Sequence, residues 1–240
     1  MEKIYEIPVN DGFRKCAEKY AEKSEIDCPF CAIYRTLEEN ELDLILGASM
    51  MEPDTRIKTN KEGFCRTHYD MMFVRKNRLG MALTLESHLD ELREQMKDSL
   101  VGKIAGKPGQ GAVRRIESLE KSCYVCGRIN FHFEHMVETA VLLWAEDEKF
   151  PPLMKSQSCF CLPHYRAMLK YASDRLSKKD YAAFYSDASE VEDKYFDKLR
   201  ADVSWFCKKY DYRYEEEPWY DSKDAVERAI KFLRSDIHKI

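Results

Sequence analysis

Two short motifs decide how this sequence folds: CPFC at residues 28–31 and FCRTHY at residues 64–69. The same pair recurs as CYVC at residues 123–126 and FCLPHY at residues 160–165, displaced by 95 and 96 residues. Two unrelated motifs would rarely be displaced by nearly the same distance. The pattern therefore indicates a tandem duplication with one inserted residue.

Each copy offers three cysteines and one histidine, which is a common donor set of structural zinc sites. A CxxC pair brings two thiolates close enough to bind one cation, and the i, i+3 spacing of CxxH puts a thiolate and an imidazole on one face of a helical turn. We therefore predict one closed Cys3His site within each half. The predicted ligands are Cys28, Cys31, Cys65 and His68 in the first half, and Cys123, Cys126, Cys161 and His164 in the second.

The donor types also restrict the metal. Soft thiolates with one imidazole suit zinc or an iron–sulfur cluster rather than magnesium or calcium. Zinc is favoured because cluster sites are usually ligated by cysteine alone, with iron–sulfur clusters as the alternative. All four ligand pairs are predicted at helix N-termini, where free backbone N–H groups stabilise thiolates. We expect two zinc ions per chain in a structural role that couples metal binding to folding.

Composition limits the class of protein. The 240 residues are 44% hydrophobic and 12% aromatic, enough for a substantial core. The net charge of −4 does not suggest a nucleic-acid partner. The N-terminus lacks a signal-peptide core, and no apolar stretch reaches the ~18 residues of a membrane span. We therefore expect no membrane association and a cytoplasmic location, where nine cysteines favour metal binding over disulfides.

The periodicity of apolar residues predicts an all-α fold. Apolar residues between Ile129 and Trp144 follow helical spacing, Tyr181–Tyr210 is predicted to form one long helix, and Asp221 or Ser222 to cap a final helix. Glycines between the two halves predict a linker. The expected division is a first repeat at residues 1–100, a linker at 101–117 and a second repeat at 118–240, with a single compact domain as the alternative.

Several other polar side chains are further candidate sites. His132 and His135 lie one helical turn apart and could bind metal, although a polar helix face is the simpler interpretation. His88 is expected to be a hydrogen-bonded helix residue. Cys159 could replace a ligand or take part in redox chemistry, but packing is the default expectation, as it is for Cys207.

The paired motifs and the tail WFCKKYDYRYEEEPWYDSKDAVERAIKFL at residues 205–233 together resemble a bacterial family of domains of unknown function. The resemblance covers nearly the whole chain. It implies a cytoplasmic protein with two metal sites and supplies no activity.

Three functions are compatible with these observations. The leading hypothesis is a non-enzymatic, metal-stabilised helical scaffold that binds a protein or small-molecule partner, since a closed four-ligand site has no open position for catalysis. No nucleophile–base or nucleotide-binding motif points to an enzyme. The alternatives are a thiol-based redox or metal sensor, with Cys159 beside one site, and an enzyme or electron carrier with iron–sulfur clusters.

Overall fold

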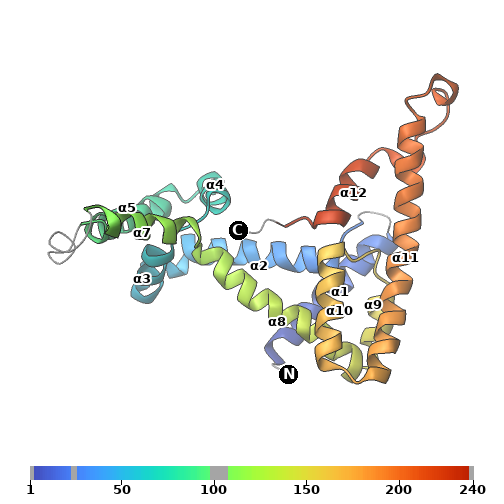
Figure 1. Ribbon diagram of the computed structural model, residues 1–240, viewed down its shortest axis with the longest axis horizontal. Coiled ribbons are helices and arrows are strands. Elements are labelled where there is room, and N and C mark those ends of the chain that lie inside the picture. Colours follow the sequence, from blue (N-terminus) through green and yellow to red (C-terminus); the bar gives the residue numbers. More distant parts are fainter. Residues whose placement is uncertain (1–2, 23–25, 98–107, 238–240) are drawn as a thin grey trace. The chain divides into compact units, whose positions relative to one another are not determined.

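The protein is all-α, as predicted (Figure 1). The computed structural model describes residues 3–22, 26–97 and 108–237, and these residues form no strand. None of the helices in the described ranges combines the length and the apolar character that crossing a bilayer requires. The α-helices are α1 (Glu6–Ala21), α2 (Pro29–Leu46), α3 (Pro53–Glu62), α4 (Arg66–Val74), α5 (Arg78–Gln95), α7 (Gln110–Glu120), α8 (Tyr124–Glu146), α9 (Phe150–Lys155), α10 (Leu162–Arg175), α11 (Lys178–Lys208) and α12 (Ala225–Arg234).

Most predicted helices are present, with shifted ends. The long helix α11 begins three residues earlier than expected because the Ser177 hydroxyl accepts a hydrogen bond from the backbone N–H of Asp180. The expected cap of the last helix was wrong. Tyr220–Ser222 forms a 3-10 turn, and Asp224 takes the N-cap position of α12.

The expected linker at residues 101–117 was wrong in its second part. Residues 101–107 lie outside the described residues, but α7 already begins at Gln110. Gly109 has φ +84°, a left-handed conformation that glycine adopts without strain just before the helix. Val113, Ile116 and Leu119 follow at helical spacing and favour the helix over an open loop.

The chain divides into two compact units whose boundaries differ from those expected. Among the described residues, unit 1 comprises residues 3–22, 26–35 and 133–237, and unit 2 comprises residues 36–97 and 108–132. The division falls inside α2 and inside α8. Each unit therefore contains sequence from both repeats, whereas the motif spacing predicted one repeat per domain.

An aromatic core holds unit 1 together. Phe13 of α1 contacts the rings of Phe30, Phe150 and Phe160 at centroid distances of 5.3, 5.0 and 6.2 Å. All four side chains are fully buried, and each buried ring contributes about 1.5–3 kcal/mol of transfer free energy. Phe30 lies within CPFC and Phe160 precedes Cys161, so this core brings those two motifs together.

In unit 2, polar contacts join α3 to α5 and to the residues that precede α3. The Arg56 guanidinium donates hydrogen bonds to the carbonyl of Met50 and to the Ser87 hydroxyl, at 2.8 and 2.7 Å. His88 Nδ1 lies 2.9 Å from the Asn60 carbonyl, to which it donates. These contacts confirm His88 as a hydrogen-bonded helix residue, and burial lowers its pKa.

One buried carboxyl in unit 1 makes stability depend on pH. Glu192 of α11 is 6% exposed, and its Oε2 accepts only a long hydrogen bond of 3.4 Å from the Phe160 N–H. Burial raises its pKa to about 8. The folded state thus binds this proton more tightly than the unfolded state. Stability is fully present below the ordinary carboxyl pKa and decreases as pH rises through about 8.

Glu192→Gln should therefore raise the melting temperature at pH 9 by a few degrees more than at pH 6, since about 1 kcal/mol corresponds to about 2–4 °C at this chain length. Thermal unfolding followed by circular dichroism at the two pH values measures the difference. Glu190→Gln is the matched control, because its lysine partners lower the pKa of that exposed carboxyl to about 2. An equal shift at both pH values in Glu192→Gln would contradict this assignment.

Candidate metal centres

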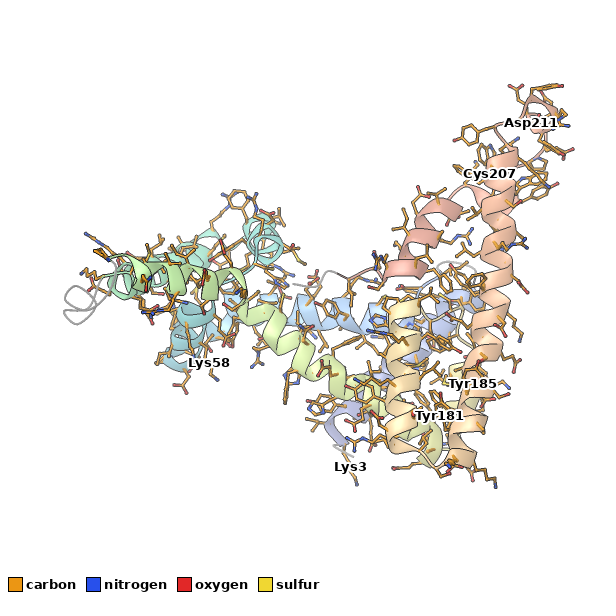
Figure 2. All side chains as sticks on the ribbon, in the orientation of Figure 1. Lys3, Lys58, Tyr181, Tyr185, Cys207 and Asp211 are labelled. Carbon is orange, nitrogen blue, oxygen red and sulfur yellow. The ribbon has the colours of Figure 1, made fainter. Side chains whose placement is uncertain are left out.

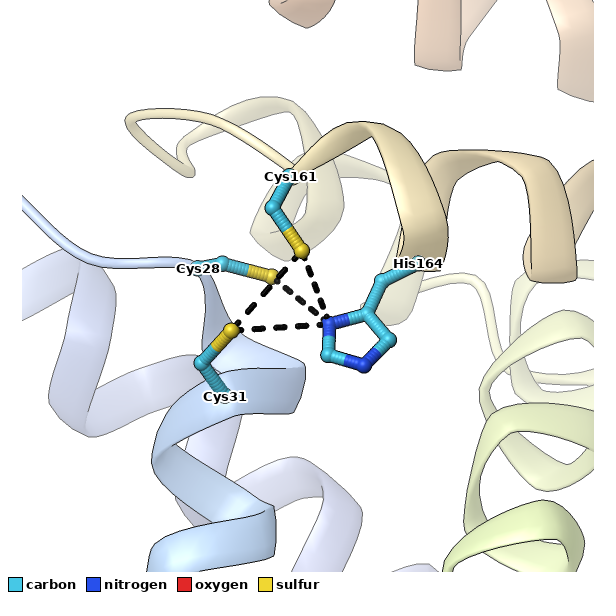
Figure 3. A group of neighbouring side chains, drawn as sticks. All are labelled: Cys28, Cys31, Cys161 and His164. Atoms are coloured by element: carbon cyan, nitrogen blue, oxygen red, sulfur yellow. Dashed lines mark hydrogen bonds between the residues drawn. The ribbon is translucent and has the colours of Figure 1, made fainter. Parts of the chain in front are cut away.

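The first centre, called here the Cys28 centre, lies in unit 1 and joins the starts of α2 and α10 (Figure 3). Cys28 precedes α2 and Cys31 lies in its first turn, while Cys161 is the N-cap of α10 and His164 lies in its first turn. His164 Nδ1 lies 3.5, 3.6 and 3.0 Å from the sulfurs of Cys28, Cys31 and Cys161. All four residues are buried.

The second centre, called here the Cys65 centre, lies in unit 2 and joins the starts of α4 and α8. Cys65 is the N-cap of α4 and His68 lies in its first turn, while Cys123 precedes α8 and Cys126 lies in its first turn. His68 Nδ1 lies 3.2, 3.2 and 3.3 Å from the sulfurs of Cys65, Cys123 and Cys126. Cys65 is half-buried and the other three are buried.

All eight predicted residues are thus gathered at helix N-termini, but the predicted grouping was wrong. The CxxC of each copy meets the CxxH of the other copy, so no site is completed within one half. The expected connections of 33 and 34 residues are replaced by one of 129 residues between Cys31 and Cys161 and one of 54 between His68 and Cys123.

Backbone contacts around each centre explain the exchange of partners. In unit 2, Gly63 ends α3 with φ +62°, and its carbonyl accepts a hydrogen bond of 3.0 Å from the N–H of Tyr124. The Ser122 hydroxyl also donates to the carbonyl of Glu62 at 2.7 Å. These hydrogen bonds involve no donor atom, and they join the residues before Cys65 to the residues around Cys123.

Unit 1 contains a corresponding hydrogen bond near its own centre. The Ser158 hydroxyl donates to the Asp27 carbonyl at 3.0 Å, so the residues just before Cys161 and Cys28 are held together. Gly12 of α1 approaches α2 closely, because an added Cβ would lie 2.4 Å from the Ile33 side chain. These contacts hold the donor residues of the Cys28 centre close together.

The donor geometry fits one tetrahedral ion in each centre. With Zn–S of about 2.3 Å and Zn–N of about 2.0 Å, a tetrahedron separates sulfurs by about 3.8 Å and sulfur from nitrogen by about 3.5 Å. The Cys31 and Cys161 sulfurs are 3.7 Å apart, and those of Cys65 and Cys126 are 4.0 Å apart. All donor atoms of a centre lie within 4.8 Å of one another. The clusters therefore indicate metal binding.

Shared hydrogen bonds prepare the thiols for this role. A hydrogen bond from Cys126, helped by one from His68, lowers the pKa of Cys123 to about 3, while the pKa of Cys126 is raised as the donor in that bond. The pKa of Cys31 is lowered in the same way by hydrogen bonds from the other two thiols of its centre. Burial lowers the pKa of His68, but the hydrogen bonds of Cys123 and Glu38 outweigh it and raise the pKa to about 10. A bound cation replaces these shared protons.

The two centres differ in what holds the histidine. His68 Nε2 lies 3.1 Å from Oε1 of the buried Glu38, whereas His164 Nε2 is buried with no hydrogen-bond partner among the described residues. The His164 ring packs instead against Phe133 at 5.1 Å. Glu38 and Phe133 occupy the same position of the repeat, seven residues after the second CxxC cysteine. The sequence analysis did not identify Glu38 as a partner of His68. The signal that could have identified it is the difference between Glu38 and Phe133 at equivalent positions of the two copies.

The other candidate residues from the sequence lie outside both metal centres. His135 stacks on Tyr5 at 5.5 Å, and neither it nor His132 belongs to a donor cluster of the described residues. Cys159 is buried against Tyr195 and outside both donor sets, which confirms packing. Cys207 was expected to be packed but is exposed on the last turn of α11 (Figure 2), because the helix presents other side chains to its neighbours there.

Glu38→Gln should weaken metal binding at the Cys65 centre by about 10–100-fold and leave the Cys28 centre unchanged. A carboxylate that accepts the second imidazole N–H fixes the tautomer and raises the basicity of the ligand. Competition with a chromophoric chelator measures the two affinities. Glu39→Gln, on the same helix but ion-paired with Arg75, is the control. Equal affinities for Glu38→Gln and the parent would refute the role of Glu38.

Comparison with known proteins yields the family. No curated protein and no solved structure matches this chain. A family model described as "Family of unknown function (DUF6062)" matches residues 1–240. This confirms the resemblance inferred from the paired motifs: the chain belongs to that family of unknown function.

Proposed function

We propose that the protein is a non-enzymatic helical scaffold that binds two zinc ions, one in the Cys28 centre and one in the Cys65 centre. The observation that carries the proposal is the closure of each centre, where four donor atoms surround a single point at tetrahedral spacing. When bound, zinc would supply a cross-link between two helix starts. With four protein donors it would have no open position for a substrate or an activated water.

The spacing of the donors supports zinc over an iron–sulfur cluster. A cluster places several iron and sulfide atoms among its ligands, and those ligands do not all bind the same iron. They must therefore lie farther apart than donors that share one ion. All four donor atoms of each centre lie within 4.8 Å of one another, which suits a single ion, and one imidazole per centre also favours zinc.

Exposed apolar side chains support the binding of a partner. Val226, Ile230 and Leu233 recur on one face of α12 and are 40%, 60% and 52% exposed, although that helix also buries Phe232. We propose a protein or small-molecule partner, with no nucleic acid, given the acidic balance of the chain. A reducing compartment such as the cytoplasm would keep the thiolates available for metal.

Elemental analysis of protein purified without oxygen should give two zinc ions per chain and a colourless solution. Removal of zinc with a chelator should lower the helical circular dichroism signal, because metal binding and folding are coupled. Restoring zinc, but not magnesium, should recover that signal. A brown protein with visible absorbance that bleaches on reduction would instead establish iron–sulfur clusters, and a metal-free protein with full helicity would refute a structural role.

A further inference from the structure

A small cavity of about 20 Å³ lies against the Cys28 centre in unit 1. Three of the four metal-ligating residues contribute to its wall, so the metal centre is not fully enclosed by packed side chains. The wall of the cavity includes Cys28, Cys31, Cys161, Cys159, Tyr195 and Arg228.

Arg228 brings a buried polar group to the wall of the cavity. This side chain is 7% exposed, and it donates hydrogen bonds of 3.0 Å to Asp224 and to Asp202 through Nε and Nη2. Its Nη1 is buried and has no hydrogen-bond partner among the described residues. A cavity of this volume with polar groups in its wall admits about one water molecule. Hydrogen peroxide is only one oxygen atom larger and forms the same kinds of hydrogen bond.

Cys159 adds a thiol that is not one of the predicted metal ligands. It lies in the wall of the same cavity as the ligand sulfurs, is buried with Tyr195, Leu199 and Phe232, and belongs to neither donor set. Residues 36–132 contain no cysteine other than the three ligands of the Cys65 centre. A spare thiol beside the metal is therefore a property of unit 1 alone.

We propose that this cavity admits hydrogen peroxide to the Cys28 centre and that Cys159 forms a disulfide with an oxidised ligand cysteine, which releases zinc. This rests on the proposed zinc binding. A ligand thiolate attacks one peroxide oxygen, the O–O bond breaks, and sulfenic acid and hydroxide form. The Cys159 thiol then attacks that sulfur. A disulfide forms, the C–S–OH oxygen leaves with the thiol proton as water, and peroxide is the two-electron oxidant.

Two arguments identify the cysteines that form the disulfide. The other ligand sulfurs are bound to zinc, whereas Cys159 can react without first leaving a metal. Cys161 is a poor partner, because residues i and i+2 of extended chain lie about 6.6–7 Å apart, at the limit for a disulfide. The expected product therefore joins Cys159 to Cys28 or Cys31.

Peptide mapping after peroxide treatment tests the proposal. The zinc-loaded protein carries Cys207→Ser, which removes an exposed thiol that would cross-link chains. After peroxide and alkylation, trypsin should release residues 156–166 disulfide-bonded to residues 24–35, with loss of zinc. Cys159→Ser should lose this cross-linked peptide. Cys16→Ser, which removes a buried cysteine that does not line the cavity, should retain it.

Before peroxide treatment, the Cys159→Ser variant should contain two zinc ions and have unchanged helicity, which establishes that it folds. If serine disturbs the core, Cys159→Ala replaces it. The proposal is overturned if the peptide persists without Cys159, since the bond then runs through Cys161. It is also overturned if peroxide yields only disulfides within residues 24–35 or within the Cys65 centre. A preparation without zinc refutes the proposed function instead, before any oxidant is added.

Discussion

The structure depends on one arrangement: CxxC at the start of one helix faces CxxH at the start of another, and the two motifs come from different copies of the repeat. In unit 1 this joins α2 to α10, and in unit 2 it joins α4 to α8. A cross-link between residues so far apart in sequence removes more conformational freedom from the unfolded chain than one inside a single repeat would. Metal binding at either centre then stabilises segments from both halves.

The crossed arrangement follows from packing and not from the metal ligands. Both centres use the same four donor types, so zinc chemistry alone accepts either grouping. The choice is made by contacts that involve no donor atom, such as the Tyr124 hydrogen bond to Gly63, the Ser158 hydrogen bond to Asp27, and the rings around Phe13. It is equivalent to a domain swap between the two halves of a single chain. In this structure each centre takes its ligands from both halves.

These facts explain what the sequence could and could not predict. Helix periodicity and the i, i+3 motif spacing are local properties, so the all-α fold, the eight ligands and their positions at helix starts were predictable. The grouping was not, because the near-equal intervals of 33 and 34 residues suggested sites closed within each half. Glu38 was missed for a similar reason: its role depends on a contact with His68 thirty residues away. Exposure of Cys207 depends on which face of α11 is covered, which periodicity does not specify.

The most direct test of the crossed centres is the zinc content of two matched double variants after dialysis against a weak chelator. Cys28→Ser with Cys161→Ser removes two ligands from one centre, so it should retain one zinc ion per chain. Cys28→Ser with Cys65→Ser removes one ligand from each centre, so it should retain none. The reverse result, none in the first variant and one in the second, would show that each repeat closes its own site and would contradict this account.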